Sequence, residues 1–252
     1  MYPILFNIGS FPVRAFDVLV VLGMVSGGLL TLQRARSAGL GGVRTAFAIV
    51  TIILAGLFGS RVGVVLASWR HYWEHPSEIF TLYGTSIQSA LVVGALVAVG
   101  VTRWLGVSFW QLGDLAAPGI ILGQALGRIG CLLNGCCHGR VTDSILGLYL
   151  PDHAGQWAVR YPTQAMHVLA NLAILALLLI LERRAPFEGF TFLMYALFFS
   201  AQRLLIDFLR EVGPTMGDSS VRYAQAVSVA TMALAGVFLV WRSVHSRPPT
   251  AK

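Results

Sequence analysis

Seven apolar runs divide this 252-residue chain, and each is about as long as a helix that crosses a membrane. They lie at about 15 to 33, 45 to 69, 86 to 105, 115 to 137, 164 to 181, 187 to 206 and 223 to 241. Composition agrees, because 56% of the residues are hydrophobic and only 12% are charged, whereas soluble domains have about 25% charged residues. The chain is therefore predicted to be an all-α polytopic membrane protein with seven transmembrane helices, forming a single integral membrane domain over residues 1–252.

Two other classes of protein are excluded by the same composition. Three cysteines are too few for a disulfide framework, and a disordered chain would need low hydrophobicity. The net charge of +7 comes almost entirely from arginine, since Lys252 is the only lysine. A general compositional bias towards arginine explains this charge equally well, so the positions of the arginines carry more information than their number. We expect membrane lipids as partners and no nucleic acid.

The distribution of basic residues predicts the orientation of the helices. Alternate connections place nine basic residues on one side of the membrane and five on the other. By the positive-inside rule the N-terminus faces out and the C-terminus faces the cytoplasm. Residues 138–163 then form an outward-facing cap, because the apolar stretch 145–151 is too short to cross as a helix and ends in Pro151. Arg34, Arg36 and Arg44 follow the first run, which favours a retained helix over a signal peptide.

Four arginines fall inside or at the edges of the apolar runs, namely Arg61, Arg128, Arg203 and Arg210. Each costs about 2.5 to 3.5 kcal/mol in a membrane interior, so each needs a partner or an anionic ligand. Arg203, Asp207 and Arg210 share one helix face. Asp207 can pair with both arginines, but one carboxylate cannot satisfy two guanidinium groups. An anion is the natural missing partner, and phosphate matches arginine donors bidentately.

The segment GRIGCLLNGCCHGR at 127–140 is the second candidate for chemistry. Its cysteines, Cys131, Cys136 and Cys137, have poor spacing for zinc and no second CxxC follows, so no metal site is predicted. We expect Cys136 and Cys137 to be packing residues or a redox-sensitive pair at the outer face. Glycines at helical spacing, Gly119, Gly123 and Gly127, predict close helix packing.

These residues resemble the prolipoprotein diacylglyceryl transferase family. The run GRIGCLLNGCCHG is similar to the family signature GRxGNFxNxExxG. YPTQ at 161–164 resembles HPSQ, RLLIDFLR at 203–210 resembles RFxxExFR, and GSRVG occurs in the second run. The landmarks follow in family order over most of the chain.

The resemblance implies transfer of an sn-1,2-diacylglyceryl group from phosphatidylglycerol to the lipobox cysteine of a preprolipoprotein, without a cofactor, in the bacterial cytoplasmic (inner) membrane. The products are a thioether and glycerol phosphate. Arg128 and Arg203 match the family's essential arginines and are expected to be catalytic. The residues expected to bind phospholipid are Arg61, Arg128, Asn134, Gly139, Asp207, Arg210 and Gln88.

The chain departs from the family pattern at several positions. Gln88 stands where the family has histidine, and glutamine cannot accept a proton as imidazole does. Cys131, Cys136 and Phe16 replace an asparagine, a glutamate and a tyrosine, and Met166-His167 replaces Tyr-Glu. Two alternatives stay open: a divergent paralogue acting on another acceptor, and a phospholipid-binding membrane protein without transfer activity. An anion transporter is disfavoured because no symmetric pair of broken helices is visible.

No general base is identified by the sequence. Nearby arginines would lower the pKa of an acceptor thiol from about 8.5 and reduce the need for one. Asp207, His138 and His167 are candidates, but each has a simpler interpretation. Asp207 is then a counter-ion of arginine, His138 a solvated loop residue, and His167 a helix histidine with satisfied hydrogen bonds.

Overall fold

The computed structural model describes residues 4–9, 11–80, 87–151, 155–211 and 222–245. Its long helices are α1 (Ala15–Ser37), α2 (Val43–Ala67), α4 (Ile87–Leu105), α5 (Phe109–Asn134), α6 (Thr163–Leu181), α7 (Phe190–Asp207) and α8 (Tyr223–His245). The short elements are α3 (Trp69–Glu74), the 3-10 helices η1 (Pro76–Phe80) and η2 (Glu182–Arg184), and the strands β1 (Ile4–Ile8), β2 (Phe11–Arg14), β3 (Leu148–Pro151) and β4 (Trp157–Arg160). Every predicted apolar run thus coincides with a long helix.

Membrane spans can be identified among these helices by length and apolar composition. Within the described ranges, six helices are long and apolar enough to cross a membrane. They are Ala15–Ser37, Val43–Leu66, Phe109–Asn134, Thr163–Arg184, Phe190–Asp207 and Ala224–His245. The part of α4 over Ser89–Leu105 is apolar but shorter. The prediction of an all-α membrane protein is confirmed, whereas the seventh crossing stays a prediction.

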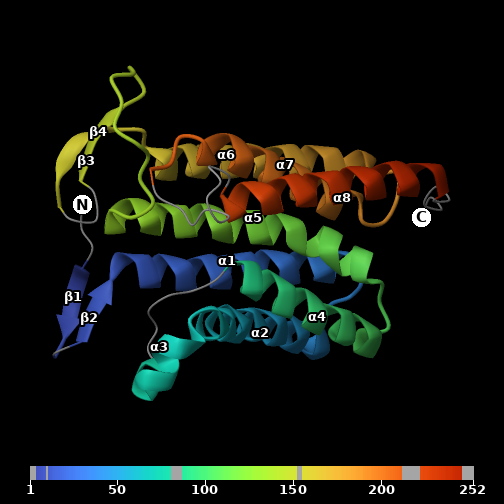
Figure 1. The fold of residues 1–252 in the computed structure, drawn as a ribbon. Coiled ribbons are helices and arrows are strands. Elements are labelled where there is room, and N and C mark those ends of the chain that lie inside the picture. The colour runs from blue at the N-terminus through green and yellow to red at the C-terminus, as the bar shows by residue number, and fades with distance from the viewer. Residues whose placement is uncertain (1–3, 10, 81–86, 152–154, 212–221, 246–252) are drawn as a thin grey trace. The chain divides into compact units, whose positions relative to one another are not determined.

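The chain divides into two compact units, Met1–Leu30 with Gly113–Lys252, and Thr31–Leu112. In the first unit, α1 runs beside α5 (Figure 1). A Cβ atom added to Gly23 would lie 2.7 Å from the carbonyl oxygen of Gly123, and one added to Gly27 would lie 2.5 Å from that of Gly119. The predicted close packing is confirmed for Gly119 and Gly123, since only glycine lets these backbones touch.

Helices α5, α6 and α7 enclose the apolar core of the first unit. Buried Ile121 of α5, Leu178 of α6 and Tyr195 of α7 pack together there. Asp114 of α5 accepts hydrogen bonds from the backbone N–H groups of Gly189, at 2.6 Å, and Phe192, at 2.9 Å. These donors belong to the first turn of α7, whose N–H groups have no partner within their own helix. Asp114 therefore fixes the start of α7 against α5.

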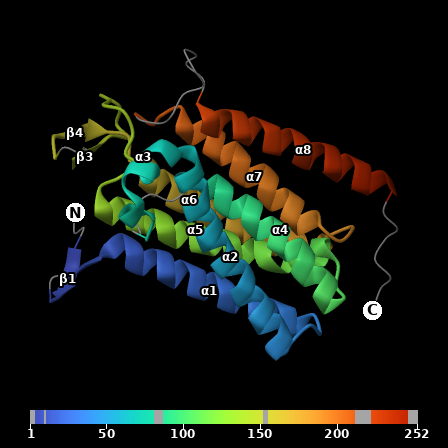
Figure 2. The same cartoon turned by 60° about the horizontal axis from the view of Figure 1, so that its bottom comes forward.

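The second unit is built on α2 and α4, which run alongside each other (Figure 2). A Cβ atom added to Gly59 would lie 2.4 Å from Cβ of Val93, so the two helices also meet at a glycine. The short helices α3 and η1 follow α2.

The connection between α5 and α6 contains an antiparallel hairpin in place of a further helix. Strand β3 pairs with β4, with Leu148 opposite Arg160 and Pro151 opposite Trp157. The prediction that the apolar stretch at 145–151 belongs to a connection is confirmed. The outward orientation of this cap stays a prediction.

Candidate active site

Three arginines come together in the first unit from the ends of α5 and α7. Arg128 lies on α5, Arg203 lies on α7, and Arg210 follows the end of α7. Arg128 and Arg210 interact electrostatically with Arg203, and all three interact with His167 of α6. The first unit therefore concentrates positive charge where α5, α6 and α7 meet. We call Arg128, Arg203 and Arg210 the arginine cluster.

Asp207 is the buried carboxylate of this region, with its side chain 2% exposed. Its Oδ1 lies 3.6 Å from Nη1 of Arg210, and its Oδ2 lies 3.3 Å from Nη1 of Arg222. Arg222 also donates to the backbone carbonyls of Asp207 and Arg210, the latter at 2.8 Å. The sequence left open that Asp207 pairs with both Arg203 and Arg210, and the structure shows the pair with Arg210. The second carboxylate oxygen contacts Arg222, which the sequence did not indicate.

Within the described part of the chain, Arg128 and Arg203 have no direct ion-pair partner, and the charge of Asp207 acts on Arg203 only at longer range. Both side chains are partly buried, and neither makes a hydrogen bond or ion pair within the described part of the chain. In the same region, the buried Nε of Arg210 has no hydrogen-bond partner among the residues that the structure describes. An unpaired guanidinium group is costly inside a membrane protein, so an anion would stabilise the arginine cluster.

The loop after α5 is held by the first residues of α6. Gly135 and Cys137 have positive φ angles of 75° and 63°, which turn the chain back sharply. The hydroxyl of Thr163 donates to the carbonyl of Cys137 at 2.6 Å, and Nε2 of Gln164 donates to that of Cys136 at 2.7 Å. Thr163 and Gln164 are fully buried. The YPTQ run and the 127–140 run thus form one structural unit.

Gly139 fixes this loop against the end of α7. Its N–H donates to the carbonyl of Tyr161 at 2.9 Å, and it forms a bridge with Arg210. An added Cβ would lie 2.6 Å from the Tyr161 carbonyl oxygen and 2.8 Å from that of Leu209. Because backbone atoms cannot move aside, only glycine fits here. Asn134, partly buried, ends α5 just before the loop.

The two candidate histidines have different environments. His138 is 4% exposed, and its Nδ1 lies 3.3 Å from Oε2 of Glu211, which also pairs with Arg160. The interpretation of His138 as a solvated residue is therefore wrong. Nδ1 of His167 lies 3.1 Å from Oε1 of Gln202, while its Nε2 is buried without a partner among the described residues. The hydrogen bonding of His167 is only half satisfied.

Arg61 and Gln88 belong to the second unit. Nε of Arg61 donates to the carbonyl of Ile79 at 2.9 Å, and its Nη2 donates to that of Glu78. Its guanidinium carbon also lies 5.1 Å from the centre of the Tyr72 ring. The side chain of Gln88 lies outside the described residues. The expected role of Arg61 in phospholipid binding stays a prediction.

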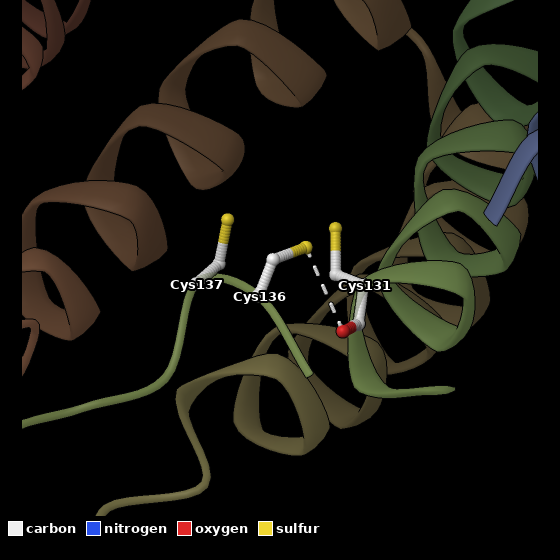
Figure 3. Close-up of side chains that lie close together, drawn as sticks. All are labelled: Cys131, Cys136 and Cys137. Atoms are coloured by element: carbon white, nitrogen blue, oxygen red, sulfur yellow. Dashed lines mark hydrogen bonds between the residues drawn. The ribbon is translucent and has the colours of Figure 1, made fainter. Parts of the chain in front are cut away.

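The three cysteines gather at the end of α5 (Figure 3). The sulfur atoms of Cys131, Cys136 and Cys137 all lie within 4.8 Å of one another. Hydrogen bonds from the thiols of Cys131 and Cys136, and then the charges of Arg210 and Arg128, lower the pKa of Cys137. Sequence spacing did not indicate this grouping, because it arises from the chain reversal at Gly135 and Cys137.

A family model described as prolipoprotein diacylglyceryl transferase matches residues 3–241. The chain belongs to this family. The match covers both compact units, so family membership does not rest on the first unit, which contains the arginine cluster, alone.

Curated relatives from three bacteria cover almost the full length of the chain. Each is named phosphatidylglycerol–prolipoprotein diacylglyceryl transferase. The proteins of Dehalococcoides mccartyi and Acaryochloris marina are each 32% identical, and that of Bacillus velezensis is 31% identical. Each alignment covers 95% of this chain. It covers 93% of the Dehalococcoides mccartyi protein, 90% of the Acaryochloris marina protein and 92% of the Bacillus velezensis protein. The resemblance to the prolipoprotein diacylglyceryl transferase family predicted from the motifs is confirmed.

Proposed function

We propose that this chain transfers a diacylglyceryl group from phosphatidylglycerol to the lipobox cysteine of a preprolipoprotein. Family membership and the names of its full-length relatives support this activity. The observation that carries it is the arginine cluster, in which Arg128 and Arg203 have no hydrogen-bond or ion-pair partner within the described chain. A lipid phosphate is the anion that such a site in a membrane protein would meet first.

The reaction joins a sulfur atom to a carbon atom and releases a phosphate ester. The acceptor thiolate attacks carbon 3 of the diacylglyceryl group, a carbon–sulfur bond forms, and the carbon–oxygen bond to phosphate breaks. The bonding electrons leave with glycerol phosphate, and the thiol proton passes to that product or to water. Arg128 and Arg203 are the proposed catalytic residues, because their donors would hold the phosphate oxygens as negative charge develops on them.

The other proposed lipid-binding residues support this pair in different ways. Asp207 orients Arg210, and Gly139 holds the loop against the end of α7. Asn134 ends the helix that carries Arg128. For Arg61 and Gln88 the proposal rests on the sequence resemblance alone. No general base is assigned, since positive charge near the acceptor thiol favours its reactive thiolate form.

The same proposal includes the location and orientation of the chain. We place it in the bacterial cytoplasmic membrane as one integral domain over residues 1–252, with α4 as the seventh crossing. The N-terminus faces out and the C-terminus faces the cytoplasm, as the distribution of basic residues indicates. Residues 138–163 then face outward, where an exported acceptor protein could dock.

A second candidate is a phospholipid-binding relative that has lost transfer, or one that uses another acceptor. Gln88 favours it, because the family histidine is absent at that position. Complementation separates the candidates: the gene is expressed in bacteria depleted of their own transferase, and lipidation of a reporter lipoprotein is measured. The proposal predicts restored lipidation. An unmodified reporter, despite normal membrane levels of the chain, would favour the second candidate.

A further inference from the structure

The thiol cluster of Cys131, Cys136 and Cys137 contains all the cysteines of this chain. Cys131 belongs to the last turns of α5, and the other two follow in the loop. Figure 3 shows the three side chains next to one another, and their sulfur atoms lie within 4.8 Å of each other. Among the described residues this is the single group of histidine, cysteine, aspartate or glutamate side chains spaced to hold a metal ion.

The loop holds these sulfur atoms in place before any ligand binds. Cys137 has a left-handed φ of 63°, a conformation that residues other than glycine rarely adopt. It is maintained by the hydrogen bonds from buried Thr163 and Gln164 to the two cysteine carbonyls. The N–H of Cys136 also donates to the carbonyl of Cys131 at 3.1 Å. A prearranged cluster loses little conformational freedom when it binds a ligand.

Two arginine side chains bring positive charge close to the thiol cluster. The Arg210 and Arg128 side chains interact electrostatically with Cys137. Three thiolates around a divalent cation carry a net charge of −1, which these guanidinium groups would attract. Thiolate is also the form in which cysteine binds metal, and soft thiolate ligands select zinc and copper(I) over harder cations.

We propose that Cys131, Cys136 and Cys137 form a three-thiolate site for one thiophilic d10 cation of the zinc, cadmium and copper(I) class. Zinc–sulfur bonds of about 2.3 Å require sulfur atoms about 3.8 Å apart, so the cluster needs to contract by about 1 Å at most. Binding forms three metal–sulfur bonds and releases three thiol protons, with no oxidant or reductant. A fourth position is left for water.

This site goes beyond the proposed transfer reaction and does not depend on it. The family signature carries asparagine and glutamate where this chain has Cys131 and Cys136. Two of the three cysteines in the cluster are therefore departures of this chain from the signature. It also differs from the sequence-based expectation of no metal, which considered only the spacing of the cysteines along the chain.

Cadmium titration of the reduced, purified full-length protein tests the site. Thiolate-to-cadmium charge-transfer absorption reports the number of thiolates bound, and here every thiolate must come from the cluster. We expect one cadmium ion per chain, absorption equivalent to three thiolates, and displacement by zinc. Absorption equivalent to fewer than three thiolates, or no absorption, would overturn the proposal.

Variants show whether the sulfur atoms of Cys136 and Cys137 are ligands. Cys136→Ser and Cys137→Ser should each weaken cadmium binding more than about 10-fold, since even the loss of groups that only orient metal ligands costs 10- to 100-fold. His71→Gln is the control, because His71 lies outside the thiol cluster and is hydrogen-bonded to Glu78; the cadmium affinity of this variant should not change. Unchanged cadmium affinity in Cys137→Ser would contradict a three-thiolate site. Thermal unfolding without metal checks that each variant is folded.

Discussion

Individual residues of the candidate site were predictable where they share a helix. Arg203 and Asp207 lie one turn apart on α7, as the helical spacing predicted, whereas Arg210 follows the end of that helix. Arg128 stood out as a charge in an apolar run. Arg222 was not predictable, because it reaches Asp207 across a connection and no periodicity links the two. The thiol cluster was missed for the same reason, since a reversal of the backbone brings its members together.

At the same scale, Asp207→Asn should strongly destabilise the protein. The carboxylate is buried and faces both Arg210 and Arg222, so its removal leaves uncompensated positive charge at a cost of about 3 kcal/mol or more. Asp143→Asn is the control, because Asp143 is exposed. Thermal unfolding in detergent should show a clearly lower midpoint for Asp207→Asn alone. Equal midpoints would show that Asp207 does not stabilise the arginines.

Among the elements, the long helices were predicted well and the short ones were not. Apolar runs fix a helix to within a few residues because a membrane helix needs an apolar stretch of set length. Strands of four or five residues, such as β1 and β2, give too short a pattern to be recognised. The β3–β4 hairpin was predicted only as a cap without structure of its own.

Helix contact at glycines gives a prediction for α5. Gly123→Ala should destabilise the protein by about 1–3 kcal/mol through overpacking, because the new Cβ would lie 2.8 Å from the carbonyl oxygen of Gly23. Gly127→Ala on the same helix is the control: nothing lies within 4 Å of its added Cβ, and alanine favours helix. Unfolding midpoints of the two variants should differ. A loss of stability as large for Gly127→Ala would argue against the α1–α5 contact.

For the molecule as a whole, composition predicted the membrane class and the motifs predicted the family. The family match over residues 3–241 confirms the second of these. The orientation of the chain in the membrane is predicted from the basic residues of the connections between helices. This signal relates the chain to the membrane, so contacts within the molecule do not reveal it.

Cysteine labelling tests this orientation. In a chain whose three native cysteines are replaced by serine, Ile145→Cys places a thiol at a fully exposed position of the cap, and Arg184→Cys places one at the exposed turn after α6. A membrane-impermeant maleimide added to intact cells should label the first and should reach the second only after permeabilisation. The reverse pattern would invert the proposed topology.

The most direct measurement of the central claim is diacylglyceryl transfer by purified protein. Labelled phosphatidylglycerol and a lipobox peptide are supplied in vesicles, and the labelled thioether product is quantified per folded protein. The wild-type chain should form product, and Arg128→Lys and Arg203→Lys should each reduce its rate by about 100-fold, because lysine keeps the charge but loses the bidentate geometry. Arg184→Lys, at an exposed arginine outside the site, should retain the wild-type rate. Wild-type rates in both site variants, or no product from the wild-type chain, would contradict the account.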